Sequence, residues 1–279
     1  MLPINWNTAI TYAVLVTIAE SVAPTGSYGQ PEKNQIQGAG YTFLQTLYAD
    51  DLATDIDTHV GDLVTFGFLA ISTARELVAA IRGTDTILEW LHDGSFLMVP
   101  SPIPGAHGFT EDGFTAVYRS LRTGQASGTV SARDSVKGYL DTAIATSVTV
   151  CGHSLGGALA TLLTLDVGLN TSCRTPAAYT FASPRTGDHI FAGSYNAAIP
   201  NSYRISNRQD LVPKLPPILP LPYEHVNTHY ELNPPANKIK LAIPCMHHLT
   251  TYLWLMGQLG GTNAYPLDSD CQTTGPNHI

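Results

Sequence analysis

The chain contains, at residues 147–167, the sequence SVTVCGHSLGGALATLLTLDV, in which a strand pattern meets a helix pattern at a turn. Its first five residues are β-branched or small, as in a buried strand, and the residues after Ser154 are dense in Ala and Leu, as in a buried helix. Between the two, residues 152–156 (GHSLG) match the pattern Gly-x-Ser-x-Gly. A sharp strand-to-helix turn of this kind presents the serine hydroxyl at the edge of a sheet, so the stretch predicts Ser154 as a nucleophile.

The turn also has the backbone that acyl transfer requires. Gly152 and Gly156 lack the Cβ atoms that would block so tight a bend. A helix that begins near Leu155 directs its first N–H groups toward the reacting centre, which makes the Leu155 N–H a candidate oxyanion donor. An ordinary glycine-rich turn is the alternative, but the strand before the motif and the helix after it favour the nucleophile.

Further strand patterns alternate with helical ones along the chain. This alternation implies a mainly parallel sheet covered on both faces, so the predicted class is α/β, a central sheet flanked by helices. No linker interrupts the pattern, and we expect a single domain over residues 1–279. A polar surface connector is expected at residues 26–40 and an ordered proline-rich loop at 213–222. The predicted strands cover Glu76–Ile81, 147–151, Ala177–Phe181 and 202–205, and the predicted helix covers 154–167.

The apolar residues 9–23 have two interpretations. Asn5 ahead of them and Pro24 after them predict a capped helix. The run also resembles the apolar centre of an export signal, although no Lys or Arg precedes it. No run in the sequence reaches the roughly 18 to 20 apolar residues that span a bilayer, so no transmembrane segment is predicted.

Charge and composition exclude one class of partner. The net charge is −8 and no basic run occurs, which argues against nucleic acid because phosphate binding needs clustered Lys and Arg. Only 13% of the residues are charged, against roughly 25% in an average soluble domain. Such a surface suits a neutral or apolar substrate at least as well as a charged one.

Four cysteines are present, and none forms a Cys-x-x-Cys pair, so zinc and thioredoxin-type sites lack support. Cys151 lies in an apolar run and is expected to be a buried free thiol. An even count allows disulfides, and four cysteines allow three pairings, among which the sequence does not choose. Cys245 with Cys271 is preferred only because it would pin the C-terminal tail. Disulfides would in turn favour export over the cytoplasm.

A serine nucleophile needs a base, and the base needs a carboxylate that orients it. After this type of turn the acid precedes the histidine in the chain. Asp210 is the leading acid because it lies just past the strand at 202–205, in a strand-end loop. Asp166 lies within the predicted helix, and Asp188 lies in a turn, so both are less suitable.

The histidine is harder to choose. His225 and His229 are four residues apart, but Pro222 argues against a helix there and no Glu follows His225, so a zinc motif is not supported. No metal or other cofactor is predicted. His247 and His248 precede an apolar helical run, and local chemistry does not separate them. The histidines after Asp210 are His225, His229, His247, His248 and His278.

The turn and several blocks of sequence before and after it follow one another in an order that matches a known family. They are VAAIRGTD at 78–85 with Trp90, AHGF at 106–109, GHSLGGA at 152–158, TFASPRTG at 180–187, YRI at 203–205 and DLVPKLP at 210–216. Together they resemble the class 3 lipase family, the fungal-lipase-like branch of the α/β-hydrolases, over roughly residues 77–257. The chain departs from the family pattern at Ala182, where Gly is common, and at Leu211, where Pro or Ile is frequent.

The resemblance implies roles for individual residues. Ser154 matches the family's nucleophile and Asp210 its orienting acid. The family's catalytic histidine precedes a helix that begins H-x-L-x-x-Y-L, and HHLTTYL at 247–253 fits with His247 in that place. Some fungal members have Tyr three positions after the histidine, a spacing that neither His247 nor His248 has, so His248 stays the alternative. Thr84 matches the second oxyanion residue, acting through its backbone N–H.

The resemblance also implies a lid over residues 90–105 (WLHDGSFLMVPSPIPG). Trp90, Phe96 and Met98 are then candidate substrate contacts, and the alternative is that this apolar segment packs as core. The implied function is a lipase or carboxylic ester hydrolase that cleaves triacylglycerol or other acyl esters through an acyl-enzyme, with a lipid at an oil–water interface as its partner. A feruloyl esterase or phospholipase A1 on the same scaffold, and a non-catalytic lipase-like binding protein, are the alternatives.

Overall fold

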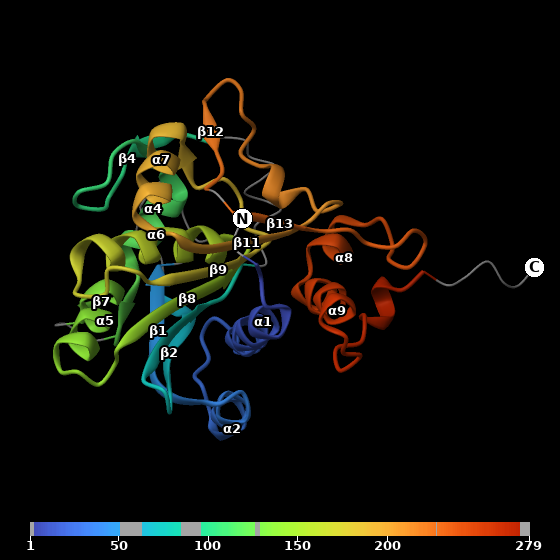
Figure 1. Ribbon diagram of the computed structural model, residues 1–279, viewed down its shortest axis with the longest axis horizontal. Coiled ribbons are helices and arrows are strands. Elements are labelled where there is room, and N and C mark those ends of the chain that lie inside the picture. The colour runs from blue at the N-terminus through green and yellow to red at the C-terminus, as the bar shows by residue number, and fades with distance from the viewer. Residues whose placement is uncertain (1–2, 51–62, 85–95, 126–128, 227, 274–279) are drawn as a thin grey trace, which may run out of the picture.

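A central sheet organises the protein. The computed structural model describes residues 3–50, 63–84, 96–125, 129–226 and 228–273. Within these ranges a nine-stranded sheet has the order β13-β11-β9-β8-β3-β2-β1-β6-β7 (Figure 1). The half from β13 to β3 is parallel, and the half from β3 to β7 is antiparallel. The predicted α/β class is confirmed.

The parallel half contains the predicted strands. Two of them have the expected bounds, and the strands that start near residues 147 and 202 are each longer than expected. The parallel strands are β3 (Glu76–Ile81), β8 (Ser147–His153), β9 (Ala177–Phe181), β11 (Asn201–Asn207) and β13 (His229–Leu232). The antiparallel strands are β2 (Leu63–Ser72), β1 (Tyr41–Asp50), β6 (Arg122–Thr123) and β7 (Val130–Ser131).

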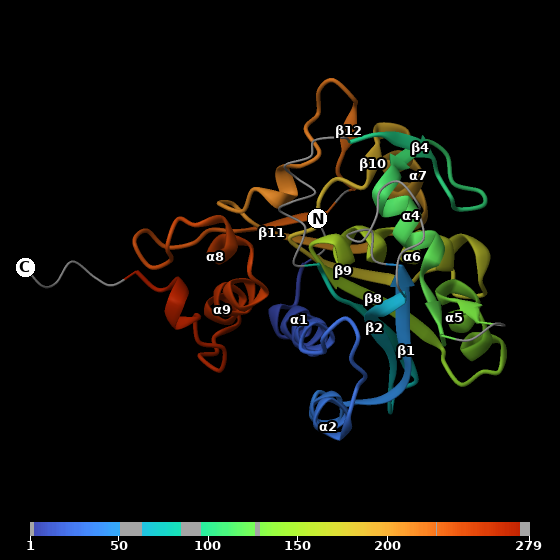
Figure 2. The ribbon, with the colours of Figure 1, turned by 180° about the vertical axis from the view of Figure 1, so that it is seen from behind.

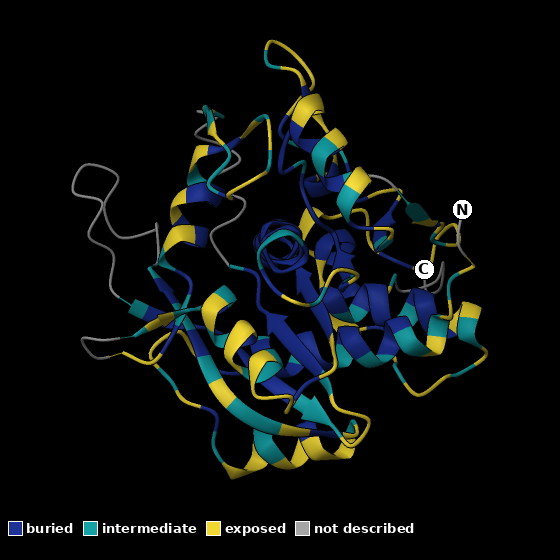
Figure 3. Cartoon of the chain, turned by 60° about the vertical axis from the view of Figure 1, so that its left-hand side comes forward, coloured by how far each residue is buried: buried dark blue, intermediate teal, exposed yellow. Residues whose placement is uncertain are grey.

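Both faces of β3, β8 and β9 are buried, which explains why these central strands are largely apolar. On β3, Leu77, Ala79 and Ile81 belong to one hydrophobic core, and Val78 and Ala80 belong to the other. Figure 3 shows these central strands as the buried interior of the molecule. The sheet therefore separates two cores, each of which is closed by its own set of helices.

The helices divide between the two faces, as the two opposite views show (Figures 1 and 2). One core is closed chiefly by α1 (Trp6–Glu20), α8 (Ile243–His247) and α9 (Leu249–Gly260), with α2 (Gln30–Gly38) beside them. The other core is closed by α4 (Asp112–Ser120), α5 (Ala132–Asp141), α6 (Leu155–Asn170) and α7 (His189–Ala198). Among the described helices, none combines the length and the hydrophobicity needed to cross a membrane.

The N-terminal run forms the predicted helix α1. The Asn5 side chain accepts hydrogen bonds from the N–H groups of Asn7 and Thr8, which satisfies two donors of the first turn. The connector expected at residues 26–40 is partly wrong, because it contains helix α2. There the Glu32 carboxylate accepts the Gly29 N–H at 2.8 Å, a helix start that the polar composition concealed.

A smaller antiparallel sheet lies beyond the main one, with the order β12-β10-β5-β4. The proline-rich loop at 213–222 begins in a short 3₁₀ turn, Val212–Lys214, and leads into this sheet at Tyr223. Arg185 orders this loop. Its backbone N–H donates to the Leu215 carbonyl and its guanidinium donates to the Pro216 carbonyl, both at 2.7 Å. The strands are β4 (Met98–Pro100), β5 (Phe109–Glu111), β10 (Gly187–Asp188) and β12 (Tyr223–Glu224).

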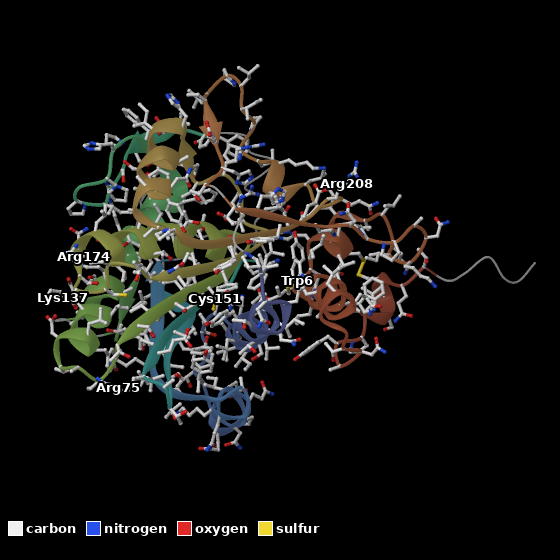
Figure 4. The ribbon with its side chains drawn as sticks, viewed as in Figure 1. Trp6, Arg75, Lys137, Cys151, Arg174 and Arg208 are labelled. Atoms are coloured by element: carbon white, nitrogen blue, oxygen red, sulfur yellow. A yellow bond between two sulfur atoms is a disulfide. The ribbon has the colours of Figure 1, made fainter. Side chains whose placement is uncertain are left out.

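The preferred cysteine pairing is confirmed. Cys245 and Cys271 form a disulfide that closes 26 residues of chain (Figure 4). Cys271 lies in the 3₁₀ turn Ser269–Cys271, and Cys245 lies in α8, two residues before His247. Cys151 is a buried free thiol, as expected.

Candidate active site

Ser154 occupies the bend between β8 and α6 in a strained conformation. Its φ is 56° and its ψ is −125°, a region that side chains with a Cβ rarely adopt. The surrounding backbone holds it there, because the Ser154 N–H donates to the Phe181 carbonyl at 2.9 Å. The predicted turn is therefore present, and it presents the Ser154 hydroxyl at the end of β8.

Two glycines make this turn possible. A Cβ added at Gly156 would lie 2.3 Å from the Arg82 carbonyl oxygen, and one at Gly152 would lie 2.1 Å from the Gly156 carbonyl oxygen. Real side chains do not tolerate such distances to backbone atoms. The start of α6 consequently packs directly on the backbone that follows β3, where the predicted oxyanion loop lies.

Three predicted side chains meet at the end of the parallel strands. The Ser154 hydroxyl lies 2.9 Å from His247 Nε2, and His247 Nδ1 lies 2.9 Å from Asp210 Oδ2. Asp210 follows β11, and His247 is the last residue of α8. Since the carboxylate can only accept, Nδ1 carries a hydrogen and Nε2 is left to accept the serine hydrogen. This is the geometry in which a histidine can take a proton from serine.

His248 is not part of this arrangement. Its ring is exposed, and its Nδ1 lies 2.8 Å from the Thr250 hydroxyl. It also accepts the Thr250 N–H, so that His248 begins helix α9. The structure therefore separates by geometry the two histidines that local sequence could not separate.

Asp210 is held by groups that the sequence reasoning did not identify. Its side chain accepts hydrogen bonds from the Tyr252 hydroxyl at 2.7 Å and from the Val212 N–H at 3.0 Å. The Tyr252 hydroxyl in turn accepts the Asn207 N–H at 2.9 Å. Asp210 is only 1% exposed, so water does not hydrate its carboxylate, and these donors supply the hydrogen bonds instead. Tyr252 is the tyrosine of the H-x-L-x-x-Y-L pattern, which could have signalled it.

The backbone that carries His247 is also fixed. The Asn207 side-chain amide donates to the Met246 carbonyl, and His153 Nε2 donates to the His247 carbonyl, both at 2.9 Å. The disulfide at Cys245 ties the same short helix to the C-terminal segment. The histidine is therefore held by its backbone as well as by its ring.

The surroundings of His247 favour its neutral form. Burial lowers the pKa of His247, and the charge of the neighbouring His153 lowers it as well. Together they outweigh the hydrogen bond and the charge of Asp210 and the charge of Glu20, which raise the pKa. The pKa of His247 is thus below its ordinary value, and near neutral pH the ring is free to accept a proton.

Both predicted oxyanion donors lie beside the nucleophile. Leu155 is the first residue of α6 and directly follows Ser154. Thr84 follows the end of β3, whose register pairs Ile81 with Gly152 of β8. Just before Thr84, a Cβ at Gly83 would lie 3.1 Å from the Ser154 Cβ, so this loop contacts the serine. Their roles as donors stay predictions.

The candidate lid is described only in part. Trp90 lies outside the described residues. Phe96 and Met98 lie before and within β4 of the smaller sheet, partly buried, and their contact with substrate stays a prediction. In the same segment Leu97 is 61% exposed, whereas Ile103 is 2% exposed and belongs to the core. The described part therefore combines an exposed apolar residue with a core residue.

His225 and His229 do not form a metal site with each other. His225 Nε2 lies 2.6 Å from the Pro213 carbonyl, and His229, in β13, lies 2.6 Å from the Ser206 hydroxyl. Across the described ranges no group of three or more His, Cys, Asp or Glu is arranged to hold a metal ion.

Comparison with known proteins agrees with this fold and site. The family model for lipase (class 3) matches residues 78–219. Phospholipase A1-II 7 from Oryza sativa subsp. indica is 32% identical over 245 residues, which cover 73% of this chain and 59% of that protein. The chain spans about half the length of such curated relatives, for example 48% of Phospholipase A1-II 6 from Oryza sativa subsp. japonica.

Solved structures share the fold at lower identity. The nonglycosylated LIP2 lipase of Yarrowia lipolytica superposes with a TM-score of 0.63 at 20% identity, over 85% of this chain and 82% of that one. The native Rhizomucor miehei lipase propeptide complex gives 0.59 at 24% identity, over 81% and 67%. The fold is the α/β-hydrolase fold of the fungal lipases. Because the family model covers half of the sequence, including the nucleophile turn and Asp210, the chain belongs to the class 3 lipase family.

Proposed function

We propose that this protein is a serine carboxylic ester hydrolase that cleaves acyl esters of lipids. The observation that carries the proposal is the hydrogen-bonded series from Asp210 through His247 to Ser154. Each of these side chains contributes what the chemistry needs: a carboxylate that orients, a neutral imidazole that accepts a proton, and a hydroxyl held on a strained bend beside that imidazole. A non-catalytic binding protein would not need this alignment.

The reaction follows from the geometry. His247 Nε2 takes the proton of Ser154 while the Ser154 oxygen attacks the ester carbonyl, and Asp210 stabilises the imidazolium. The N–H groups of Leu155 and Thr84 hold the oxyanion, each worth on the order of 100- to 1000-fold in rate. The imidazolium then protonates the departing alcohol, which leaves an acyl-enzyme. Water, deprotonated by His247, attacks the acyl carbon and frees the acid and Ser154.

The main candidate substrate is triacylglycerol, as implied by the family and by the apolar segment around Leu97. A phospholipid is the second candidate, because the curated relatives with about one third identity are phospholipases A1. The proposed partner is therefore a lipid or another acyl ester. If the protein is a lipase, we expect it to bind this substrate at an oil–water interface.

A panel of esters tests the proposal. The purified protein is offered p-nitrophenyl esters of increasing acyl length, methyl ferulate, a triacylglycerol emulsion and phosphatidylcholine vesicles, with fatty-acid release titrated for the last two. We expect turnover of acyl esters longer than acetate and a higher rate once the triacylglycerol is emulsified. Strict preference for acetate without activation by an emulsion would overturn the lipase version. Release of fatty acid from phosphatidylcholine alone would favour the phospholipase.

The pH dependence of hydrolysis reports the base. Since His247 must be neutral to accept a proton and its pKa is lowered, activity is full above that pKa and is lost as the pH falls through it. We expect kcat/KM for a soluble ester to rise along an acid limb whose midpoint lies below about 6.5, the ordinary value for histidine. The measurement is kcat/KM from about pH 4 to pH 8. A midpoint above about 7 would contradict the assignment.

A further inference from the structure

The C-terminal end of helix α1 contacts the site from the side opposite α6. Glu20, its last residue, lies 2.8 Å from His153 Nδ1, and it accepts the Gly83 N–H in a longer hydrogen bond of 3.4 Å. Two residues later, the Val22 carbonyl accepts the Arg82 guanidinium at 2.9 Å. One short segment thus contacts both the residue before the nucleophile and the loop before Thr84. Glu20 lies outside the residues that the family model matches.

His153 connects Glu20 to the base. Its Nε2 donates to the His247 carbonyl at 2.9 Å, and the His153 and His247 rings lie 4.7 Å apart between centroids. Its other nitrogen, Nδ1, faces Glu20. The His153 side chain is 8% exposed and that of Glu20 is 26% exposed, so most of this contact is shielded from water. A continuous set of contacts therefore runs from α1 through β8 to the backbone of His247.

The hydrogen-bond partners determine the protonation of this pair. A carbonyl only accepts, so His153 Nε2 carries a hydrogen, and an ionised Glu20 likewise requires a hydrogen on Nδ1. Burial lowers the pKa of His153, but the charge and hydrogen bond of Glu20 outweigh it and raise the pKa. Burial raises the pKa of Glu20, but His153 and the Gly83 N–H outweigh it and lower the pKa. The hydrogen-bond geometry and the direction of both pKa shifts therefore favour an imidazolium paired with a carboxylate.

We propose that Glu20 is a positioning residue of the active site. Through His153 it fixes the backbone that carries the base His247, and through the Gly83 N–H it fixes the loop that carries the predicted oxyanion donor Thr84. This inference rests on the proposed function, since positioning is defined by the reaction that it serves. Glu20 touches no reacting atom, so its effect is on the alignment of the groups that do.

Kinetics of two Glu20 variants test the proposal. Glu20→Ala removes both contacts, and we expect kcat to fall on the order of ten- to a hundredfold while KM changes little, since misplacement of reacting groups acts on the chemical step. One oxygen of Glu20, Oε1, makes both contacts, so in Glu20→Gln an amide N–H in its place can donate to Nδ1 of a neutral His153, whereas the longer contact with the Gly83 N–H is lost. We therefore expect Glu20→Gln to recover most of the lost kcat. Unchanged kcat in Glu20→Ala, or equal losses in both variants, would overturn the proposal.

Tyr12→Phe is the matched control on the same helix. The buried Tyr12 hydroxyl donates to Glu76 at 2.6 Å, so its removal breaks a hydrogen bond between α1 and the sheet that is not part of the site. We expect a lower melting temperature with kcat unchanged. If Tyr12→Phe lowers kcat as much as Glu20→Ala does, then the loss comes from general loosening of α1 and the proposal is wrong.

The pH profile gives a readout that a purely structural role would not move. His247 contacts Asp210 from the loop after β11 and His153 from β8. Behind Asp210 lies Tyr252 of α9, and behind His153 lies Glu20 of α1. Glu20→Gln lets His153 become neutral, so the positive charge nearest His247 is lost together with the negative charge of Glu20, which raises the pKa of His247 by less than the charge of His153 lowers it. The pKa of His247 then rises, and the acid limb of kcat/KM should move to higher pH. An acid limb that stays in place would count against the charged pair.

Histidine ¹⁵N spectra separate this proposal from the proposed function. At pH 7 the wild-type protein should show His153 protonated on both nitrogens, and Glu20→Ala should show Nδ1 without its hydrogen and a shifted His247 signal. These signals do not require turnover. If the wild-type protein shows these signals but hydrolyses no ester, the proposed hydrolase function is wrong and the Glu20–His153 contact is supported. If the His247 signal is unchanged in Glu20→Ala, the proposed positioning role of Glu20 is wrong.

Discussion

Ser154→Ala is expected to lower kcat for ester hydrolysis on the order of 10⁵- to 10⁶-fold, because no other atom can form the acyl-enzyme. The Ser154 oxygen is the atom at which His247 and the oxyanion loop converge, and the residual rate would come only from binding and the oxyanion donors. The rates are measured with a soluble p-nitrophenyl ester. In parallel, wild type and variant are treated with a p-nitrophenyl phosphonate and the intact masses are compared.

Wild type should gain the mass of one phosphonyl group with release of one p-nitrophenol, and Ser154→Ala should gain none. Ser154→Gly serves as a second control, because glycine accepts the φ of 56° that strains other residues. We expect it to be as inactive as Ser154→Ala and about 1 kcal/mol more stable to urea. Wild type that does not react, under conditions that label another serine hydrolase, would overturn the assignment of Ser154.

His247→Ala is expected to reduce kcat by a similar factor, whereas His248→Ala should keep kcat within about twofold of wild type. The reason is geometric, since His247 alone of the two lies between Ser154 and Asp210. His248 instead begins helix α9, so its replacement should cost about 1 kcal/mol of stability, as the loss of a helix cap does. Both quantities come from steady-state kinetics and urea unfolding of the same preparations.

The pair of variants is its own control, because the two histidines are adjacent and differ only in what they contact. An inactive His248→Ala with an active His247→Ala would reassign the base. If both variants were inactive yet folded, the position of His247 would have to depend on His248, and the exposed His248–Thr250 contact would need a new interpretation.

The sequence predicted which residues meet at Ser154 better than it predicted how the sheet and helices are arranged. Residues 152–156 decide a local turn, so the strand, the glycines and Ser154 could be read from one short segment. Asp210 followed from its place after a strand, and His247 needed the resemblance to known lipases, because its neighbour has the same side chain. Only the fold shows which of the two rings points at Ser154.

Other features depend on contacts between distant segments. The antiparallel half of the sheet was not predicted, since the pairing of β1 with β2 is specified by tertiary contacts that no short pattern announces. Tyr252 belongs to the H-x-L-x-x-Y-L pattern, whereas Glu20 belongs to no motif in the sequence. Their partners Asp210 and His153 lie far from them along the chain. A residue that acts on a remote backbone leaves no local motif, which is why Glu20 was missed.

Helices α1 and α9 lie side by side and share one core, although almost the whole chain separates them (Figure 1). A ribosome that adds about 5 to 20 residues per second makes α9 on the order of ten seconds or more after α1. Throughout that interval the apolar side of α1 lacks the helix that covers it, and the emerging chain offers a binding surface to chaperones. The nascent protein also carries Ser154 before His247, so the contact between the two side chains cannot form until the residues up to His247 have been made.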